Sequence, residues 1–255
     1  MCHSLTAGLR NSAAGPSFFF ALLFSVLAVA NLRKENDRRA GIWVGLLAFK
    51  PTLLPLWIFW FAVRQRWRAL TYTAGVSGAI ALVSVLLVGI RGTVDYWRLS
   101  QQVMRGAFYT MLPINMPTLR AVTYFFHLGD LAWLILLGAV LLVLWKFTGS
   151  SDWGCCAMIA ALTLVAPHMH PQDLVLLLIV VGLILVQSPA PPSVFVRWSL
   201  FAFMLSQSAA RVLFAGVRGN HWPVIPLILV GLFASFVVLA ERQRKLSNPS
   251  LPAVS

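Results

Sequence analysis

Long apolar runs alternate with short polar segments along the chain, and this pattern is typical of membrane helices, which need about 20 residues to cross a bilayer. We expect about seven full spans, in the runs 16–30, 70–90, 131–145, 154–166, 174–186, 194–214 and 222–240. The pattern therefore predicts an all-α, polytopic transmembrane helical bundle. We expect one transmembrane domain over residues 1–241 and a disordered, basic cytoplasmic tail over residues 242–255.

A further apolar run, residues 40–63, is interrupted by Lys50 and Pro51, and both of its flanks are basic. If this run spans, the two flanks lie on opposite sides of the membrane. If it is a re-entrant hairpin of two half-helices, both flanks are cytoplasmic, and the positive-inside rule favours that version. It places 12 basic residues inside: Arg33, Lys34, Arg38, Arg39, Arg64, Arg66, Arg68, Lys146, Arg197, Arg242, Arg244 and Lys245. Residues 91–127 then form an extracytoplasmic loop.

Composition narrows the class of protein further. The 255 residues are 59% hydrophobic and 11% charged, whereas a soluble domain has roughly a quarter of its residues charged. The net charge of +13 lies in short clusters between apolar runs, so it marks loops of a multi-pass protein of the plasma (inner) membrane rather than a nucleic-acid surface. The three cysteines form neither a disulfide framework nor a metal-ligand spacing, and we expect no cofactor.

Lys50 is the most informative single residue, because it lies about ten residues from each end of its apolar run. An ammonium at that depth costs several kcal/mol unless it is paired or hydrated, so a functional role is the default interpretation. A lysine that only shapes the bundle or reaches a head group is the alternative. Pro51 adds a helix break beside the charge.

A second candidate site is the segment of residues 167–173, which carries His168, His170 and Asp173 between two apolar runs. General acid–base work or phosphate binding is one interpretation. A metal site is another, although it needs further ligands from elsewhere. The structural alternative is a helix end at which Asp173 caps the next helix.

The loop 91–127 contains further cations. Residues 94–111 predict an amphipathic helix in the interface, with Arg98 and Arg105 on its polar side. It serves either as a surface anchor or as an arginine clamp for a lipid phosphate. Arg120 follows a turn and begins a short apolar helix, and it is a further phosphate candidate.

Several blocks of the sequence resemble glycosyltransferase family 87, the DUF2029-type membrane enzymes with a GT-C fold. The blocks are A-G-x3-G-L-L-x2-K-P-x-L from Ala40 to Leu53, R-W-R-A from Arg66 to Ala69, M-P-T-L-R from Met116 to Arg120, and A-P-H with D-L-V-L-L from Ala166 to Leu177. They occur in the family's order and cover most of residues 8–185. A Gly-Gln-Asn stretch of the family is replaced by residues 8–12, without the glutamine.

The family's N-terminal part, with the loop carboxylate generally taken to be the base, has no counterpart here, so the resemblance implies the C-terminal two thirds of an enzyme. It implies transfer of a hexose, foremost mannose, from a polyprenyl-phosphate donor to a glycan or glycolipid acceptor at the extracytoplasmic face. Donor, acceptor and membrane lipid are then the partners, and nucleic acid is not.

Within the chain, Lys50, Arg120, Arg98 and Arg105 would bind the donor phosphate, and His168, His170 or Asp173 would serve as the base. We expect Lys50, Arg120 and the two histidines to face one cavity. A transporter or flippase with a broken helix and a non-catalytic scaffold remain alternatives.

Overall fold

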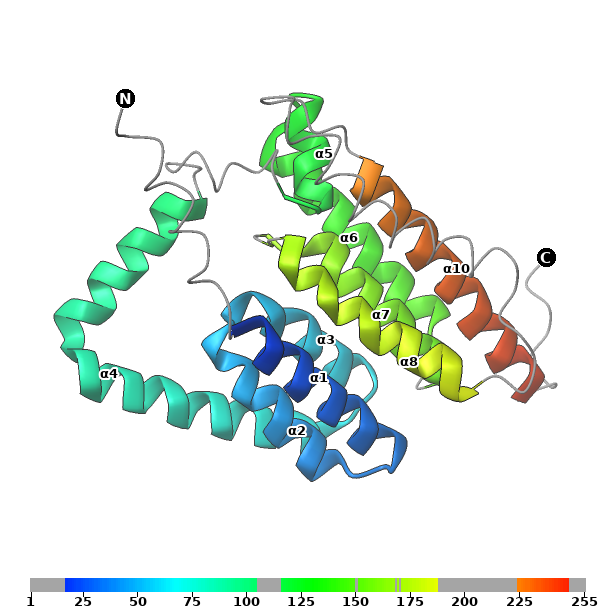
Figure 1. The fold of residues 1–255 in the computed structure, drawn as a ribbon, viewed down its shortest axis with the longest axis horizontal. Coiled ribbons are helices and arrows are strands. Elements are labelled where there is room, and N and C mark those ends of the chain that lie inside the picture. The colour runs from blue at the N-terminus through cyan, green and yellow to red at the C-terminus, as the bar shows by residue number, and fades with distance from the viewer. Residues whose placement is uncertain are drawn as a thin grey trace, which may run out of the picture.

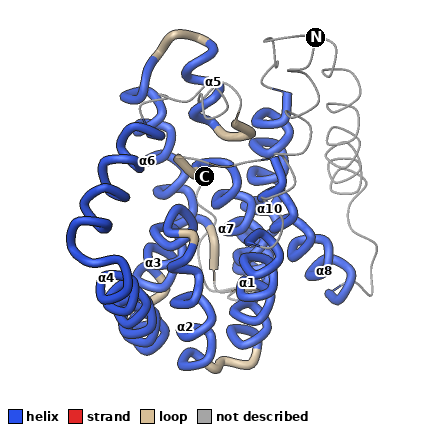
Figure 2. Tube along the Cα trace, turned by 60° about the vertical axis from the view of Figure 1, so that its left-hand side comes forward, coloured by secondary structure: helices blue, strands red, loops and turns tan. Residues whose placement is uncertain are grey.

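The computed structural model describes residues 17–104, 116–149, 151–167, 169, 171–187 and 224–247, and helix is the regular structure in all of these ranges. The helices and 3₁₀ turns are α1 Ser17–Arg33, α2 Asp37–Leu46, η2 Leu47–Phe49, η3 Pro51–Leu53, α3 Leu54–Val63, α4 Trp67–Met104, α5 Leu119–Phe125, α6 Gly129–Phe147, α7 Asp152–Val165, η6 Pro171–Leu176, α8 Leu177–Gln187 and α10 Val224–Ser247. Figure 1 shows their arrangement. The prediction of an all-α chain is confirmed for these residues, which contain no strand (Figure 2).

The predicted break in the second apolar run lies at Lys50, between η2 and η3. Lys50 has φ −127° and ψ 75°, a non-helical conformation, as expected because a following proline disfavours the helical region. The two flanks of the run meet: Arg66, just after α3, donates to Asp37, the first residue of α2, at 2.6 Å. Segment α2–α3 is therefore a hairpin in shape, with Lys50 at its tip.

Helix α4 bends sharply at Gly89, so that its 38 residues form two arms (Figure 1). Gly89 has φ 73° and ψ 170°, a conformation that is essentially reserved for glycine. The second arm, residues 90–104, corresponds to the first part of the predicted interfacial helix. Its Tyr96 and Trp97 are 61% and 65% exposed, as expected of side chains that face a membrane interface.

One end of the bundle gathers the basic helix ends, and we call it the basic end. Here α1, α3, α6 and α10 finish and α2, α4 and α7 begin. Side chains tie these ends together: Arg33 Nε to Asp152 Oδ2 at 3.2 Å, Arg66 Nη1 to Asp37 Oδ1 at 2.6 Å, Arg64 Nη2 to the Leu144 carbonyl at 2.8 Å, and Arg244 Nη1 to the Lys146 carbonyl at 3.1 Å. The hairpin tip points away from this end.

The core of the bundle is α7, in which every residue from Gly154 to Val165 is buried. It packs against α6, α8 and α10, and the three are seen around it in Figures 1 and 2. Its helix ends before Pro167. Because α7 runs from the basic end, its last turn delivers the 167–173 segment to the opposite end of the bundle.

Length and hydropathy qualify three of the described helices as membrane spans: Trp67–Gln102, Gly129–Phe147 and Pro226–Leu246. Helices α1, α7 and α8 are shorter, with 17, 14 and 11 residues, so the expected seven spans remain a prediction. The run 194–214 lies outside the described residues.

Helix α10 continues to Ser247, into the tail that was expected to be disordered from residue 242, and residues 248–255 lie outside the described part of the chain. Two contacts stabilise this extension. Glu241 and Lys245 form an ion pair at 3.1 Å one turn apart, and Arg244 donates to the end of α6. Basic side chains also interact favourably with a helix C-terminus.

Candidate functional site

The candidate site is the segment from Pro167 to Asp173, which leads from the end of α7 into the first turn of η6, at the end of the bundle opposite the basic end. It leaves α7 through Ala166, whose ψ of 132° ends the helix. Pro167 cannot continue the helical hydrogen bonds because it lacks an N–H group. Met169 in the middle of the segment is 1% exposed. Thus the side chain of Met169 is packed into the protein rather than held in solvent.

The carboxylate of Asp173 accepts a hydrogen bond from Lys50 Nζ and forms an ion pair with it. The two residues are 123 positions apart in sequence. The side chain of Asp173 is 3% exposed and that of Lys50 is 20% exposed, so the carboxylate is enclosed while part of the lysine side chain stays accessible. Asp173 lies in the first turn of η6, which runs directly into α8.

Arg120 reaches the other end of the same segment. Its Nη1 donates to the carbonyl of Pro167 at 3.1 Å. Its Nε and Nη2 donate to the two oxygens of Asp130 at 2.8 and 3.1 Å, which is the bidentate geometry that arginine and carboxylate prefer. The guanidinium also lies 5.8 Å from the ring centre of Trp133.

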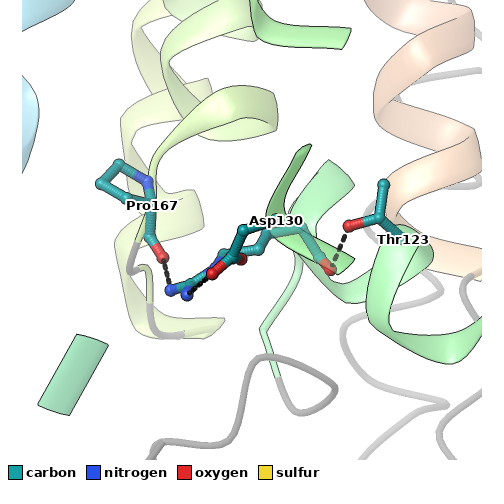
Figure 3. Close-up of polar contacts among 4 residues, drawn as sticks. Thr123, Asp130 and Pro167 are labelled. Carbon is teal, nitrogen blue, oxygen red and sulfur yellow. Dashed lines mark hydrogen bonds and ion pairs between the residues drawn. The ribbon is translucent and has the colours of Figure 1, made fainter. Parts of the chain in front are cut away.

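The structure thus brings two of the predicted cations to one segment, Arg120 at its first residue and Lys50 at its last. Figure 3 shows the Arg120 end, where Pro167 and Asp130 approach one guanidinium. Three of the candidates, His168, His170 and Arg105, lie outside the described residues. The common cavity expected from the sequence therefore stays a prediction.

Arg98 is not brought to this segment. It lies on the second arm of α4 and pairs with Asp95 at 3.6 Å, with both side chains more than 70% exposed. The arm position fits an interfacial anchor, and the expectation that Arg98 binds the same phosphate as Lys50 gains no support from its placement.

Asp130 is the residue of this region to which the sequence assigned neither a role nor a partner. It precedes an apolar run and reads as a helix start, where an acidic side chain is common. The sequence did hold a clue to its partner. Asp130 follows Arg120 by ten residues, and two opposite charges on the same side of the membrane can form an ion pair. Within the described residues, no group of three or more His, Cys, Asp and Glu side chains is placed to hold a metal ion.

An integral membrane bundle with paired charges inside it defines a class of membrane protein rather than one activity. A model of glycosyltransferase family 87 matches residues 12–189. This range is more than half of the chain and includes Lys50, Arg120 and Asp173, so the chain belongs to glycosyltransferase family 87, a family of membrane glycosyltransferases. No curated protein and no solved structure matches the chain.

One of the sequence blocks that resemble the family, A-G-x3-G, has a structural role between α2 and α4. Gly41 and Gly45 let α2 approach α4 closely, since a Cβ on Gly41 would lie 2.3 Å from the Ala69 carbonyl oxygen. Thr73 and Ser77 of α4 donate to the carbonyls of the same two glycines, at 3.1 and 3.2 Å. The A-G-x3-G block therefore packs two helices.

Proposed function

We propose that this glycosyltransferase transfers a hexose, foremost mannose, from a polyprenyl-phosphate donor to a glycan or glycolipid acceptor at the extracytoplasmic face of the plasma membrane. One observation carries the proposal: the Lys50–Asp173 ion pair at the tip of the hairpin, opposite the basic end. In this proposal Lys50 binds the donor phosphate, and the segment 167–173 supplies the groups that act on the acceptor.

The chemistry of the donor explains why a lysine is needed. When the glycosidic bond breaks, the leaving group is a lipid phosphate that gains negative charge, and a preorganised cation stabilises that charge in the transition state. An ammonium has three N–H donors, and the recorded side-chain bond of Lys50 goes to Asp173. Because the Lys50 side chain is 20% exposed while Asp173 is enclosed, the donor phosphate in this proposal approaches from the side of Lys50.

Asp173 then has the role of holding Lys50. Its side chain is 3% exposed and its carboxylate is already engaged by the Lys50 ammonium, so it is not free to approach the hydroxyl of an acceptor. We therefore assign the acceptor base to His168 or His170, which belong to the segment whose two ends are held by Arg120 and Lys50. Histidine is the commonest general base in enzymes.

The depth of Lys50 fits a lipid-linked donor. Lys50 follows Asp37 by 13 residues, so at ~1.5 Å per helical residue it lies about 20 Å from the basic end. The positive-inside rule places the basic end in the cytoplasm. In a hydrocarbon core of ~30 Å, Lys50 then lies in the outer half, where an isoprenoid phosphate of the outer leaflet can be drawn in.

The experiment that tests the proposal is sugar transfer by the full chain, purified and reconstituted in vesicles. The donors are polyprenyl-phosphate mannose, the same lipid carrying glucose, and nucleotide-activated mannose, each with a mannosyl glycolipid acceptor. We expect product from a lipid-phosphate donor, most from the mannose form, and none from the nucleotide sugar. Product from the nucleotide sugar with no product from the lipid-phosphate donors would reject the proposal.

A further inference from the structure

Arg120 was expected to bind the donor phosphate, but its surroundings point to another role. Its side chain is 4% exposed, although it carries a full positive charge. The guanidinium edge formed by Nε and Nη2 is occupied by Asp130, and Nη1 is engaged by the Pro167 carbonyl. To bind these N–H groups, a phosphate would have to displace Asp130 or the Pro167 carbonyl. The displaced partner would then lose its charge-assisted hydrogen bond to Arg120.

The contact with Pro167 has a clear structural purpose. The last carbonyls of α7 have no partner within the helix, and the helix cannot extend through Pro167. Arg120, which belongs to α5, binds the carbonyl of Pro167, two residues beyond the end of α7. At the same time the side chain is fixed from the other side by Asp130, which belongs to the first turn of α6. The place where the segment 167–173 leaves α7 is therefore set by α5 and α6.

The local backbone supports the same role. The hydroxyl of Thr123 donates to the Arg120 carbonyl at 3.0 Å, within α5 (Figure 3). The turn between α5 and α6 is closed by the Leu128 amide, which donates to the Thr123 carbonyl at 2.8 Å. His127 and Gly129 in this turn have positive φ values of 55° and 71°. These contacts hold Arg120 and Asp130 in register with each other.

We propose that Arg120 and Asp130 form a positioning pair of the transferase. Arg120 does not touch the donor; through the Pro167 carbonyl it holds the segment that carries His168 and His170 at the place where Lys50 binds the other end. The inference rests on the proposed function where it concerns transfer, and on the structure alone where it concerns the position of the segment.

Two measurements on the full chain in detergent test this pair. In Arg120→Met, which keeps the length of the side chain and removes its donors, amide hydrogen exchange across residues 167–176 should accelerate about tenfold, the factor expected for one lost charge-assisted hydrogen bond. Exchange in α2 and α3 should be unchanged. The control is Arg39→Met, the same substitution at an exposed site of the basic end, which should alter neither region.

The second measurement separates positioning from donor binding. With the polyprenyl-phosphate donor, Arg120→Met should lower kcat and leave the donor KM within about twofold of the wild-type value, because no ground-state contact with the donor is lost. A raised donor KM together with unchanged exchange at residues 167–176 overturns the inference. If Arg120→Met does not fold, Arg120→Lys takes its place, since a lysine cannot bind Asp130 and Pro167 in the same fork geometry.

The exchange measurement does not depend on transfer. If the wild-type chain shows no transfer from lipid-phosphate donors, the proposed function fails, while faster exchange in Arg120→Met still supports the positioning pair. If the wild-type chain is active and Arg120→Met exchanges as the wild type does, the positioning pair fails and the proposed function stands. Asp130→Asn is an intermediate variant. It weakens the bonds of Arg120 to residue 130 but leaves the bond of Arg120 to Pro167. Amide exchange at residues 167–176 should therefore be faster than in the wild type and slower than in Arg120→Met.

Discussion

Arg66 lies just after α3 and donates from Nη1 to Oδ1 of Asp37, the first residue of α2, at 2.6 Å. This ion pair closes the hairpin whose tip is Lys50, and both side chains are largely shielded, with 19% and 24% exposure. The R-W-R-A block of the family therefore begins with a residue that fixes the hairpin base. The pair links the basic flanks that the sequence predicted to share one side of the membrane.

The first prediction concerns this hairpin base. Asp37→Arg and Arg66→Asp should each lower the thermal stability of the purified chain, because each leaves two like charges facing one another. The double variant restores an ion pair and should recover most of the loss, with a coupling energy of about 1 kcal/mol. Losses that simply add in the double variant would show that the two residues do not interact.

A second prediction concerns the contact between α2 and α4. In Gly45→Ala the new Cβ would lie 2.6 Å from the Cβ of Val76, so the helices must separate. We expect a loss of about 1–3 kcal/mol, the usual cost of overpacking. The matched control is Gly75→Ala on α4, where nothing lies within 4 Å and where alanine favours the helix. Equal stability of the two variants would contradict the close packing.

The third prediction concerns the orientation of the chain in the membrane. Single cysteines at Arg68, beside the hairpin base, and at Gln102, on the second arm of α4, should react with a membrane-impermeant thiol reagent from opposite sides. The background lacks Cys2, Cys155 and Cys156. Arg68→Cys should react from the cytoplasmic side, following the positive-inside rule. Reaction of both sites from one side would mean that α4 does not cross the membrane before Gly89.

A fourth prediction concerns the ion pair itself. Asp173→Asn should destabilise the chain by about 3 kcal/mol, because it leaves the Lys50 charge without its partner in a medium of low dielectric constant. The charge-swapped variant Lys50→Asp with Asp173→Lys should regain stability in thermal unfolding. It should not regain transfer, because the ammonium then sits on η6 instead of the hairpin tip. Restored transfer would show that any cation in the region suffices.

The sequence was a good guide wherever a residue acts through its own neighbours in the chain. The Lys50–Pro51 dipeptide predicted the break, because a proline excludes the preceding residue from a helix. The polar segment after residue 90 predicted a separate helix, and the bend at Gly89 provides it. The clustered arginines predicted that both flanks of the hairpin lie together, and the Asp37–Arg66 pair joins them.

The pairings between residues distant in the chain could not be predicted from the sequence. The run of Lys50 offers no acidic neighbour, and its partner Asp173 lies 123 positions away. Arg120 was interpreted as a phosphate ligand because the sequence shows no partner for an arginine at this helix start. The packing of α5 against α6 shows that its guanidinium binds Asp130. The role of Gly41 and Gly45 was missed as well, although their four-residue spacing is a known helix-packing signal.

Transfer by Lys50→Gln tests the central claim most directly. The glutamine keeps the approximate size and polarity of the side chain and removes its charge, and Lys34→Gln, on the exposed α1–α2 loop of the basic end, is the matched control. With polyprenyl-phosphate mannose as donor, we expect kcat to fall by about 10²–10³ in Lys50→Gln, the cost of losing one preorganised stabilising group, and to stay at the wild-type value in Lys34→Gln. Folded Lys50→Gln that transfers at the wild-type rate would contradict the assignment of Lys50 to the donor phosphate.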